Sequence, residues 1–170
     1  MSAQLDRVTI PAEGSEQVQL GGLGIVWKIE GAEAGERFSV VHHPLEPRAL
    51  AAPLHRHTRE DEYSYVLEGT LGALLGDDVV EAGPGTWVFK PRNQWHTFWN
   101  AGEEPARILE IICPAGFDQF FAELVDLGGV TGADPQTLGA LCQRYELEMD
   151  PETVPGLVER FGLKFPGEPI

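Results

Sequence analysis

In the first 112 residues, hydrophobic and β-prone side chains occur in short runs separated by clusters of turn-forming residues. Such runs are typical of strands, whereas glycine, proline and aspartate between them favour turns. We predict strands at residues 18–20, 23–29, 37–42, 63–67, 87–89, 97–100 and 108–112. Many short strands punctuated in this way favour a sandwich or a barrel, so the expected core is all-β.

After residue 116 the hydrophobic residues recur at the spacing of amphipathic helices. One apolar stripe comprises Phe117, Phe120, Phe121, Leu124 and Val125, and a second comprises Leu138, Leu141, Cys142 and Tyr145. Asp134 and Pro135 are typical of the N-cap and first residue of the second helix. A third short helix is expected to begin near Pro155 and to end at Gly162.

Length and composition indicate one globular domain. The chain has 170 residues, of which 42% are hydrophobic and 23% charged, and this is enough to bury a core. We expect a barrel in residues 1–115 and C-terminal helices in residues 116–170. Because no internal repeat divides the sequence, we expect these helices to pack on the barrel within the same domain.

The net charge of −15 argues against nucleic acid and anionic membranes as partners, because both would repel the chain. No stretch approaches the ~18–20 apolar residues of a membrane span, and the first seven residues lack a leader pattern. Cys113 and Cys142 are too few for a disulfide scaffold, and we interpret them as buried thiols, with a disulfide between them left open. The expected location is the cytoplasm.

Three histidines and a glutamate have an order that suits one metal ion. His55 and His57 are two residues apart, so on an extended strand both point the same way, about 6–7 Å apart. A turn at residues 58–61 would return the chain and bring Glu62 in on a neighbouring strand, and His96 would be the long-range ligand. A mixed nitrogen and oxygen set of this kind binds divalent transition metals such as Fe, Ni, Mn, Cu or Zn, one per chain.

Other acidic and histidine residues nearby are less suitable ligands. Glu60 and Asp61 lie in the same acidic turn, where carboxylates are normally solvated, although either is an alternative to Glu62. His42 and His43 are adjacent, so they face opposite sides of a strand and cannot both reach one ion. We interpret both as ordinary strand residues.

The flanking residues resemble the two motifs of the cupin family, which read G-x5-H-x-H-x3,4-E-x6-G and G-x5-P-x-G-x2-H-x3-N. Besides the four ligand positions, the chain matches at Gly69, Gly85, Pro91 and Asn100. It departs at Ala49, where the first motif begins with glycine, and at Asn93, where the second has an internal glycine. Asparagine tolerates a left-handed turn better than other non-glycine residues, so that turn stays feasible.

The motifs cover residues 49–100 with fifteen residues between them, so the chain resembles a small single-domain cupin of the quercetin-dioxygenase-like kind. The resemblance implies a jelly-roll barrel, that is, a double-stranded β-helix. It also implies one divalent metal held by His55, His57, Glu62 and His96, and a homodimer. Tyr63 and Tyr65, which face away from Glu62, are candidates for a packing or subunit surface.

Strand alternation predicts part of the substrate pocket. If Glu62 and His96 face inward, so do Ser64 and Val66 on one strand and Phe98 and Asn100 on the other. These four residues would give a mostly apolar small-molecule site with a few polar groups, although Asn100 has a competing structural role at a strand end. The stripe of Phe117 and its helical neighbours is expected to pack on the barrel exterior, with a lid as the alternative. The sequence does not determine whether Trp87 and Phe89, which share one face of their strand, point into the barrel or away from it.

The resemblance favours a dioxygenase acting on a small enolic or aromatic substrate, with Glu62 as the general base that takes the substrate hydroxyl proton. Two alternatives stay open. One is a redox-neutral cyclase, isomerase or lyase in which the metal acts as a Lewis acid. The other is a non-catalytic module that binds a metal or a small molecule, because a fold alone does not fix a reaction.

Overall fold

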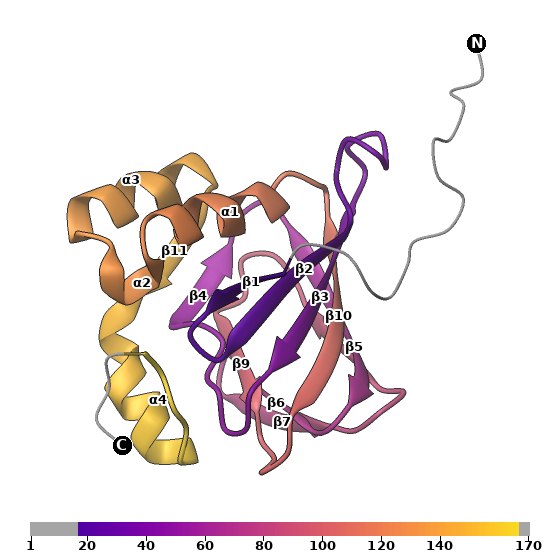
Figure 1. Cartoon of the computed structure of the whole chain (residues 1–170), viewed down its shortest axis with the longest axis vertical. Coiled ribbons are helices and arrows are strands. Elements are labelled where there is room, and N and C mark those ends of the chain that lie inside the picture. The colour runs from indigo at the N-terminus through magenta and orange to yellow at the C-terminus, as the bar shows by residue number, and fades with distance from the viewer. Residues whose placement is uncertain (1–16, 167–170) are drawn as a thin grey trace.

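A computed structural model describes residues 17–166, and its core is a barrel of two antiparallel sheets that face each other (Figure 1). The six-stranded sheet runs in the order β1 (Gln17–Leu20), β2 (Leu23–Ile29), β3 (Ser39–Leu45), β10 (Ala106–Cys113), β5 (Asp61–Glu68) and β8 (Trp87–Lys90). The five-stranded sheet runs in the order β11 (Leu147–Asp150), β4 (Leu54–His57), β9 (His96–Asn100), β6 (Leu71–Leu75) and β7 (Asp78–Ala82). Several pairs join strands distant in sequence, as β10 pairs with both β3 and β5. This arrangement confirms the predicted all-β jelly roll.

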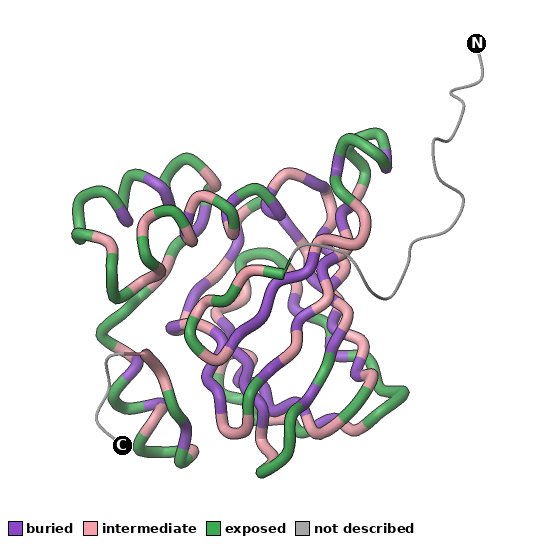
Figure 2. Tube along the Cα trace, in the orientation of Figure 1, coloured by how far each residue is buried: buried purple, intermediate pink, exposed green. Residues whose placement is uncertain are grey.

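The barrel interior is filled by every second residue of the long strands. Buried and partly exposed positions alternate along β3, β5 and β10, as expected of strands with one face inward (Figure 2). Val41, Val66 and Ile108 are fully buried in the main apolar cluster. Each such side chain stabilises the fold by roughly 1.5–3 kcal/mol relative to an exposed one.

The C-terminal region contains α1 (Asp118–Asp126), α2 (Gly129–Gly132), α3 (Pro135–Arg144), the 3-10 helix η1 (Pro151–Thr153) and α4 (Val154–Phe161). The predicted cap of α3 is confirmed, because the Asp134 side chain accepts a hydrogen bond from the Thr137 amide at 3.0 Å. The predicted end of α4 is confirmed at Gly162, whose φ of 63° is left-handed. The Phe161 ring stacks on Trp99 with centroids 4.3 Å apart, which fixes α4 against the outside of the barrel.

Besides β4, whose extended form was assumed only for His55 and His57, three strands lie outside the predicted runs, and each owes its conformation to tertiary pairing. The sequence of β6 is Leu-Gly-Ala-Leu-Leu, in which glycine and alanine disfavour strands. Gly72 is needed there because a Cβ atom would lie 2.2 Å from Nε1 of its cross-strand partner Trp99. β7 was left unassigned between two clusters of turn formers but pairs with β6, and β11 contains good helix formers but pairs with β4.

Helix length bears on the expectation that the chain does not enter membranes. Among residues 17–166, no helix is long and apolar enough to span a bilayer. The cytoplasmic location stays a prediction.

Candidate metal centre

Three imidazoles project from one face of the five-stranded sheet. His55 and His57 point inward from β4, and His55 is the cross-strand partner of His96 on β9. The ring centroids of His55 and His96 are 4.4 Å apart, and those of His55 and His57 are 5.3 Å apart. The pairing of β4 with β9 therefore completes the three-histidine face that the sequence predicted.

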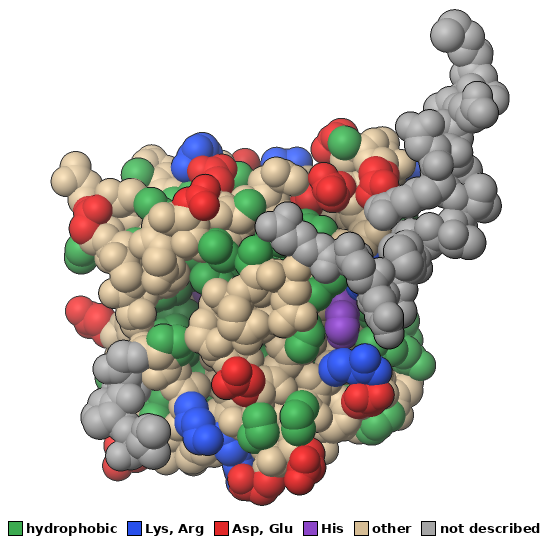
Figure 3. Space-filling model, in the orientation of Figure 1, with side chains coloured by type: hydrophobic (Ala, Val, Ile, Leu, Met, Phe, Trp, Pro, Cys, Tyr) green, Lys and Arg blue, Asp and Glu red, His purple; other side chains and the backbone are tan. Residues whose placement is uncertain are grey.

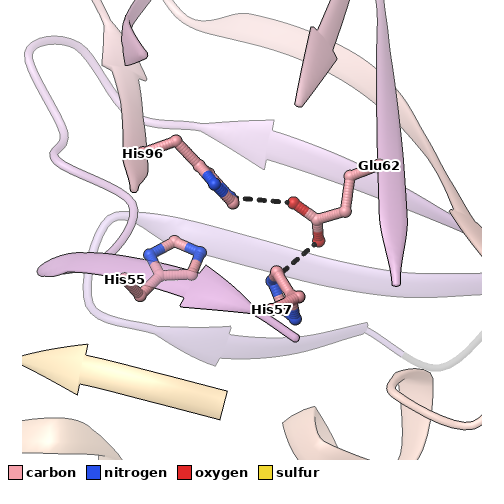
Figure 4. Close-up of side chains that lie close together, drawn as sticks. All are labelled: His55, His57, Glu62 and His96. Atoms are coloured by element: carbon pink, nitrogen blue, oxygen red, sulfur yellow. Dashed lines mark hydrogen bonds and ion pairs between the residues drawn. The ribbon is translucent and has the colours of Figure 1, made fainter. Parts of the chain in front are cut away.

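The fourth residue, Glu62, reaches this face from the opposite sheet. The sequence predicted a neighbouring strand, but β4 and β5 lie in different sheets, so the turn carries the chain across the barrel. Glu62 Oε1 lies 3.4 Å from His57 Nε2, and Glu62 Oε2 lies 3.2 Å from His96 Nε2 (Figure 4). One ligand atom from each of the four residues lies within 4.8 Å of the others, and all four side chains are buried. We call this group the histidine–glutamate cluster.

Backbone carbonyls orient two of the imidazoles. His55 Nδ1 lies 2.8 Å from the Pro53 carbonyl, and His96 Nδ1 lies 2.9 Å from the Gln94 carbonyl. Because a carbonyl only accepts hydrogen bonds, each Nδ1 carries the proton and each Nε2 keeps a lone pair facing the cluster. Such second partners are typical of histidines that bind metals.

The environment of the cluster fits a cation. Within residues 17–166 neither ring nitrogen of the buried His57 has a hydrogen-bond partner, and an unsatisfied buried polar group costs about 1–3 kcal/mol. Burial and the neighbouring imidazoles hold the pKa of His55 well below its usual value. Burial raises the pKa of Glu62, but Lys90 and His57 outweigh it and hold that pKa well below normal. A neutral imidazole beside an ionised carboxylate is the form that binds a divalent metal.

The turns around the cluster clarify the other predicted positions. Asn93 has a φ of 65°, so it takes the left-handed turn expected where the motif has glycine, and its amide donates to the His57 carbonyl at 2.7 Å. Glu60 is buried behind His57, with Oε2 3.7 Å from Nδ1, and is not part of the cluster. Asp61 forms an ion pair with Arg92 at 2.7 Å and is also outside it.

A charged network that the sequence analysis missed lies beside the cluster on the six-stranded sheet. Lys90 is the cross-strand partner of Glu62, and Glu110 is that of Ser64. Lys90 Nζ lies 3.1 Å from Glu62 Oε2 and 2.8 Å from Glu110 Oε2, and Ser64 Oγ donates to Glu110 Oε2 at 2.8 Å. We call these four residues the Lys90 network. A glutamate within the apolar run of residues 108–112 was the available signal.

The Lys90 network is fully buried, which shifts its protonation. Burial raises the pKa of Glu110 to about 7, and the Glu62 charge adds to that increase. Burial lowers the pKa of Lys90, but the carboxylates of Glu110 and Glu62 outweigh it and hold that pKa above normal. Lys90 Nζ also lies 4.4 Å from the centroid of the Phe98 ring. Lys90 is therefore a fixed cation between two carboxylates.

The cluster opens onto a cavity of about 240 Å³. Its wall is mainly apolar and includes Phe98 and five residues of or next to α1: Phe117, Phe120, Phe121, Leu124 and Val125. The expectation that this stripe packs on the barrel exterior is wrong, because an amphipathic pattern reveals a buried face but not what covers it. The stripe closes one end of the barrel. Figure 3 shows apolar side chains gathered where the helices meet the barrel. Phe117 packs edge-on against His57 with centroids 4.3 Å apart.

Of the four residues predicted to line the pocket, one lies on the cavity surface and three lie behind it. Phe98 lines it, whereas Ser64, Val66 and Asn100 are buried but are not among the residues of its wall. Ser64 holds Glu110, and Val66 belongs to the core. Asn100 donates to the Glu104 and Glu46 carbonyls at 2.7 and 3.0 Å, which matches the structural role considered for it.

His43 lines the cavity, although it was interpreted as an ordinary strand residue. Burial lowers the pKa of His43 to about 4, so the imidazole is neutral at neutral pH. Its Nδ1 lies 2.9 Å from the Gly24 carbonyl and must donate to it, which leaves Nε2 as an acceptor. His42 is half-buried on the other face of β3, as alternation predicted.

Comparison with known proteins supports the same fold. Residues 41–112 match the family model described as a cupin domain, and this span contains the whole histidine–glutamate cluster. A comparison with curated proteins found no match. The barrel is thus a cupin fold, as the motifs predicted, whereas the likeness to quercetin-dioxygenase-like members stays a prediction.

Solved structures similar to the chain have several activities. KdgF from a Halomonas species is 16% identical, with a TM-score of 0.58, over 65% of this chain and 96% of that chain. The Streptomyces nucleoside dehydratase Pac13 is 16% identical, with a TM-score of 0.53, over 66% of this chain and 87% of that chain. A cupin sugar phosphate isomerase from Silicibacter pomeroyi is 24% identical, with a TM-score of 0.53, over 62% of this chain and 74% of that chain. At these identities the similarity establishes the fold alone.

Proposed function

We propose that this protein is a metal-dependent enzyme that acts on a small, largely apolar substrate bearing a hydroxyl or carbonyl oxygen. The observation that carries the proposal is the cavity, whose wall is mainly apolar and aromatic and meets the histidine–glutamate cluster at His55 and Glu62. Its other polar side chains are Glu110, His43, Gln19 and Thr131. Small-molecule sites typically combine an apolar wall with a few polar groups that fix orientation. His55, His57, Glu62 and His96 would hold one divalent transition metal.

The donor set suits a reactive metal rather than a closed structural one. Four protein ligands leave one or two positions free on a metal that accepts five or six. When bound, a divalent metal would polarise a substrate oxygen as a Lewis acid and make its neighbouring proton more acidic. The protein's own contribution is to orient the substrate through the aromatic wall and to exclude water.

The charges of the wall favour an uncharged substrate. Among residues 17–166, no arginine or lysine lines the cavity, since Lys90 lies behind its surface. A phosphate group would lie near the carboxylates of Glu62 and Glu110 without a cation of the protein to pair with it. We therefore favour an enol, phenol or hydroxy ketone over the phosphorylated sugars that the Silicibacter enzyme's description names.

Among reaction types, we favour redox-neutral proton transfer, as in an isomerase or lyase. Glu62 is a poorer base than the sequence analysis supposed, because its low pKa and its contacts with His57, His96 and Lys90 suit a ligand. Glu110, with a pKa of about 7, is better matched to proton transfer at neutral pH. The activities described for Pac13 and the Silicibacter isomerase are of this redox-neutral kind.

A dioxygenase is the second candidate, favoured by the aromatic wall of Phe98, Phe117 and Phe120, which fits a planar aromatic or enolic molecule. The two candidates differ in their need for oxygen. We would measure turnover of a panel of enols, phenols and hydroxy ketones with and without oxygen. Product formation without oxygen supports proton-transfer chemistry, and oxygen uptake that matches product supports the dioxygenase. Binding without turnover by any panel member would favour a non-catalytic module.

The metal is tested first, on protein purified without chelators. We expect about one transition metal per chain in wild type, most of it lost in His57→Ala and some retained in Glu62→Gln. His42→Ala is the matched control, because His42 is a half-buried histidine on the outer side of β3. Less than ~0.1 metal per chain after reconstitution of wild type would rule out the metal centre.

A further inference from the structure

Glu110 has one carboxylate oxygen anchored and the other buried without a partner among residues 17–166, in a residue that lines the cavity. Its Oε2 receives the contacts from Lys90 and Ser64, both at 2.8 Å. Its Oε1 is buried and has no hydrogen-bond partner within residues 17–166. Because Glu110 forms part of the cavity wall, Oε1 is the oxygen left for a bound molecule.

The surrounding residues hold this carboxylate in one orientation. The Lys90 ammonium is fixed by Glu62, by Glu110 and by the face of the Phe98 ring. Ser64 is the direct cross-strand partner of Glu110, so its hydroxyl reaches Oε2 without strain in the pairing. An unpaired carboxylate oxygen in such a rigid, buried position costs about 1–3 kcal/mol, and a hydrogen bond from a ligand would recover this.

Glu62 has no equivalent free oxygen. Its Oε1 faces His57, and its Oε2 faces both His96 and Lys90. The two buried carboxylates are therefore divided between two tasks, with Glu62 turned toward the histidines and Glu110 toward the cavity.

We propose that Glu110 is the catalytic residue that takes a proton from a substrate hydroxyl, with Lys90 and Ser64 as its positioning residues. This inference rests on the proposed function. In the step, the substrate O–H bond breaks, the electron pair stays on the substrate oxygen, and the proton moves to Oε1 of Glu110. The reverse transfer returns the proton to the product, so no oxidant or reductant is consumed.

The variant Glu110→Gln tests the role because its geometry is predictable. Lys90 has only donors, so it and Ser64 would hold the glutamine carbonyl, and the amide NH2 would point into the cavity. The cavity-facing atom would then change from an acceptor to a donor without a change in size. Glu68→Gln is the matched control, because Glu68 is a glutamate at the exposed end of β5, paired with Arg107 at 2.6 Å.

The probes are catechol and its monomethyl ether guaiacol, both neutral at the pH used, titrated into zinc-loaded protein and followed by calorimetry. The titrations are run at pH about 8, above the pKa of about 7 of Glu110, so that the carboxylate is ionised. We expect wild type and Glu68→Gln to prefer the diol, and Glu110→Gln to lower that preference about 10–100-fold. Calorimetry in two buffers should give about one proton fewer released per bound diol in wild type than in Glu110→Gln.

The outcomes separate this inference from the proposed function. If wild type binds neither probe in a zinc-dependent way, the proposed function fails and the inference falls with it. If wild type binds the diol in a zinc-dependent way but Glu110→Gln keeps the same preference and proton release, the inference alone is overturned. Should Glu110→Gln not fold, Glu110→Asp keeps the charge for Lys90 but withdraws Oε1 from the cavity, and we expect the same loss of preference.

Discussion

Lys90 and Glu62 are cross-strand partners of β8 and β5, and their charged atoms lie 3.1 Å apart in a fully buried position. The ammonium also neutralises Glu110 at 2.8 Å, so one buried cation serves two buried carboxylates. This places an excess negative charge beside the histidines. A divalent cation at the histidine–glutamate cluster would offset that charge, which links the stability of the barrel to metal binding.

Lys90→Met should strongly destabilise the metal-free protein. The variant leaves Glu62 and Glu110 buried without their shared cation, and breaking a buried pair on one side typically costs about 3–5 kcal/mol. We expect zinc to raise the free energy of unfolding of Lys90→Met more than that of wild type, because zinc replaces part of the lost charge. Urea unfolding with and without zinc measures both effects.

Arg107→Met is the control for that comparison. Arg107 pairs with Glu68 across β10 and β5 of the same six-stranded sheet, but both side chains are about half exposed. Exposed pairs contribute only about 0–1 kcal/mol. Equal losses of stability in Lys90→Met and Arg107→Met would contradict the argument that Lys90 neutralises two buried carboxylates.

The neutral imidazole of His43 should make the protein less stable as the pH falls. The pKa of His43 is about 4 in the fold against 6.5 for a free histidine, so the unfolded chain binds the extra proton first. Stability should therefore fall as the pH is lowered from 6.5 towards 4, by at most about 3 kcal/mol from this residue. Urea unfolding of wild type and His43→Gln across this range measures the effect.

We expect the pH dependence to be shallower in His43→Gln, because glutamine does not titrate. His42→Gln is the control, because His42 is only half-buried and its pKa is lowered less far. A His43→Gln profile as steep as that of wild type would assign the acid sensitivity to other groups.

The sequence was most informative where a single short segment determines the local structure. His55 and His57 share a face because of alternation alone, and Asp134 caps α3 because of local geometry alone. Lys90 and Glu110 were missed because each is a single charged residue in its own strand, and only the register of β5 with β8 and β10 brings them together. Pairing between distant strands is not encoded in any short window of sequence.

The stripe on α1 illustrates the same limit for helices. Its spacing correctly predicted a buried apolar face at Phe117, Phe120 and Leu124, all less than 5% exposed. The partner of that face is the mouth of the barrel rather than its outside, because Phe117, just before α1, packs against His57 and lines the cavity. Periodicity determines which residues are buried but not against what.

Phe121 should set the size of molecule that the cavity accepts. Its half-buried ring lines the cavity and packs edge-on against His43, with centroids 5.5 Å apart. Phe121→Ala should therefore favour 2,3-dihydroxynaphthalene over catechol by ~10-fold relative to zinc-loaded wild type. Competition titrations measure the ratio. Phe161→Ala removes a ring stacked on Trp99 outside the barrel and should leave the ratio unchanged.

The predicted homodimer has a specific candidate surface on the outside of the six-stranded sheet. Trp87 and Phe89 on its edge strand are 54% and 48% exposed, and they pack against Tyr65 and Tyr63 with ring centroids 4.7 and 4.8 Å apart. Exposed aromatic residues grouped in this way are typical of subunit contacts. We expect Trp87→Ser with Phe89→Ser to convert a dimer to a monomer in light scattering.

Two further measurements decide whether the surface at Trp87 and Phe89 forms the dimer contact. Val79→Ser is the matched control, because Val79 is 43% exposed on β7 of the other sheet and should not affect association. Each chain carries a net charge of −15, so the subunits repel each other and salt should strengthen the dimer by screening that repulsion. Wild-type protein that is monomeric at both low and high salt would rule out the homodimer, and a dimer that survives both serine substitutions would assign it to another surface.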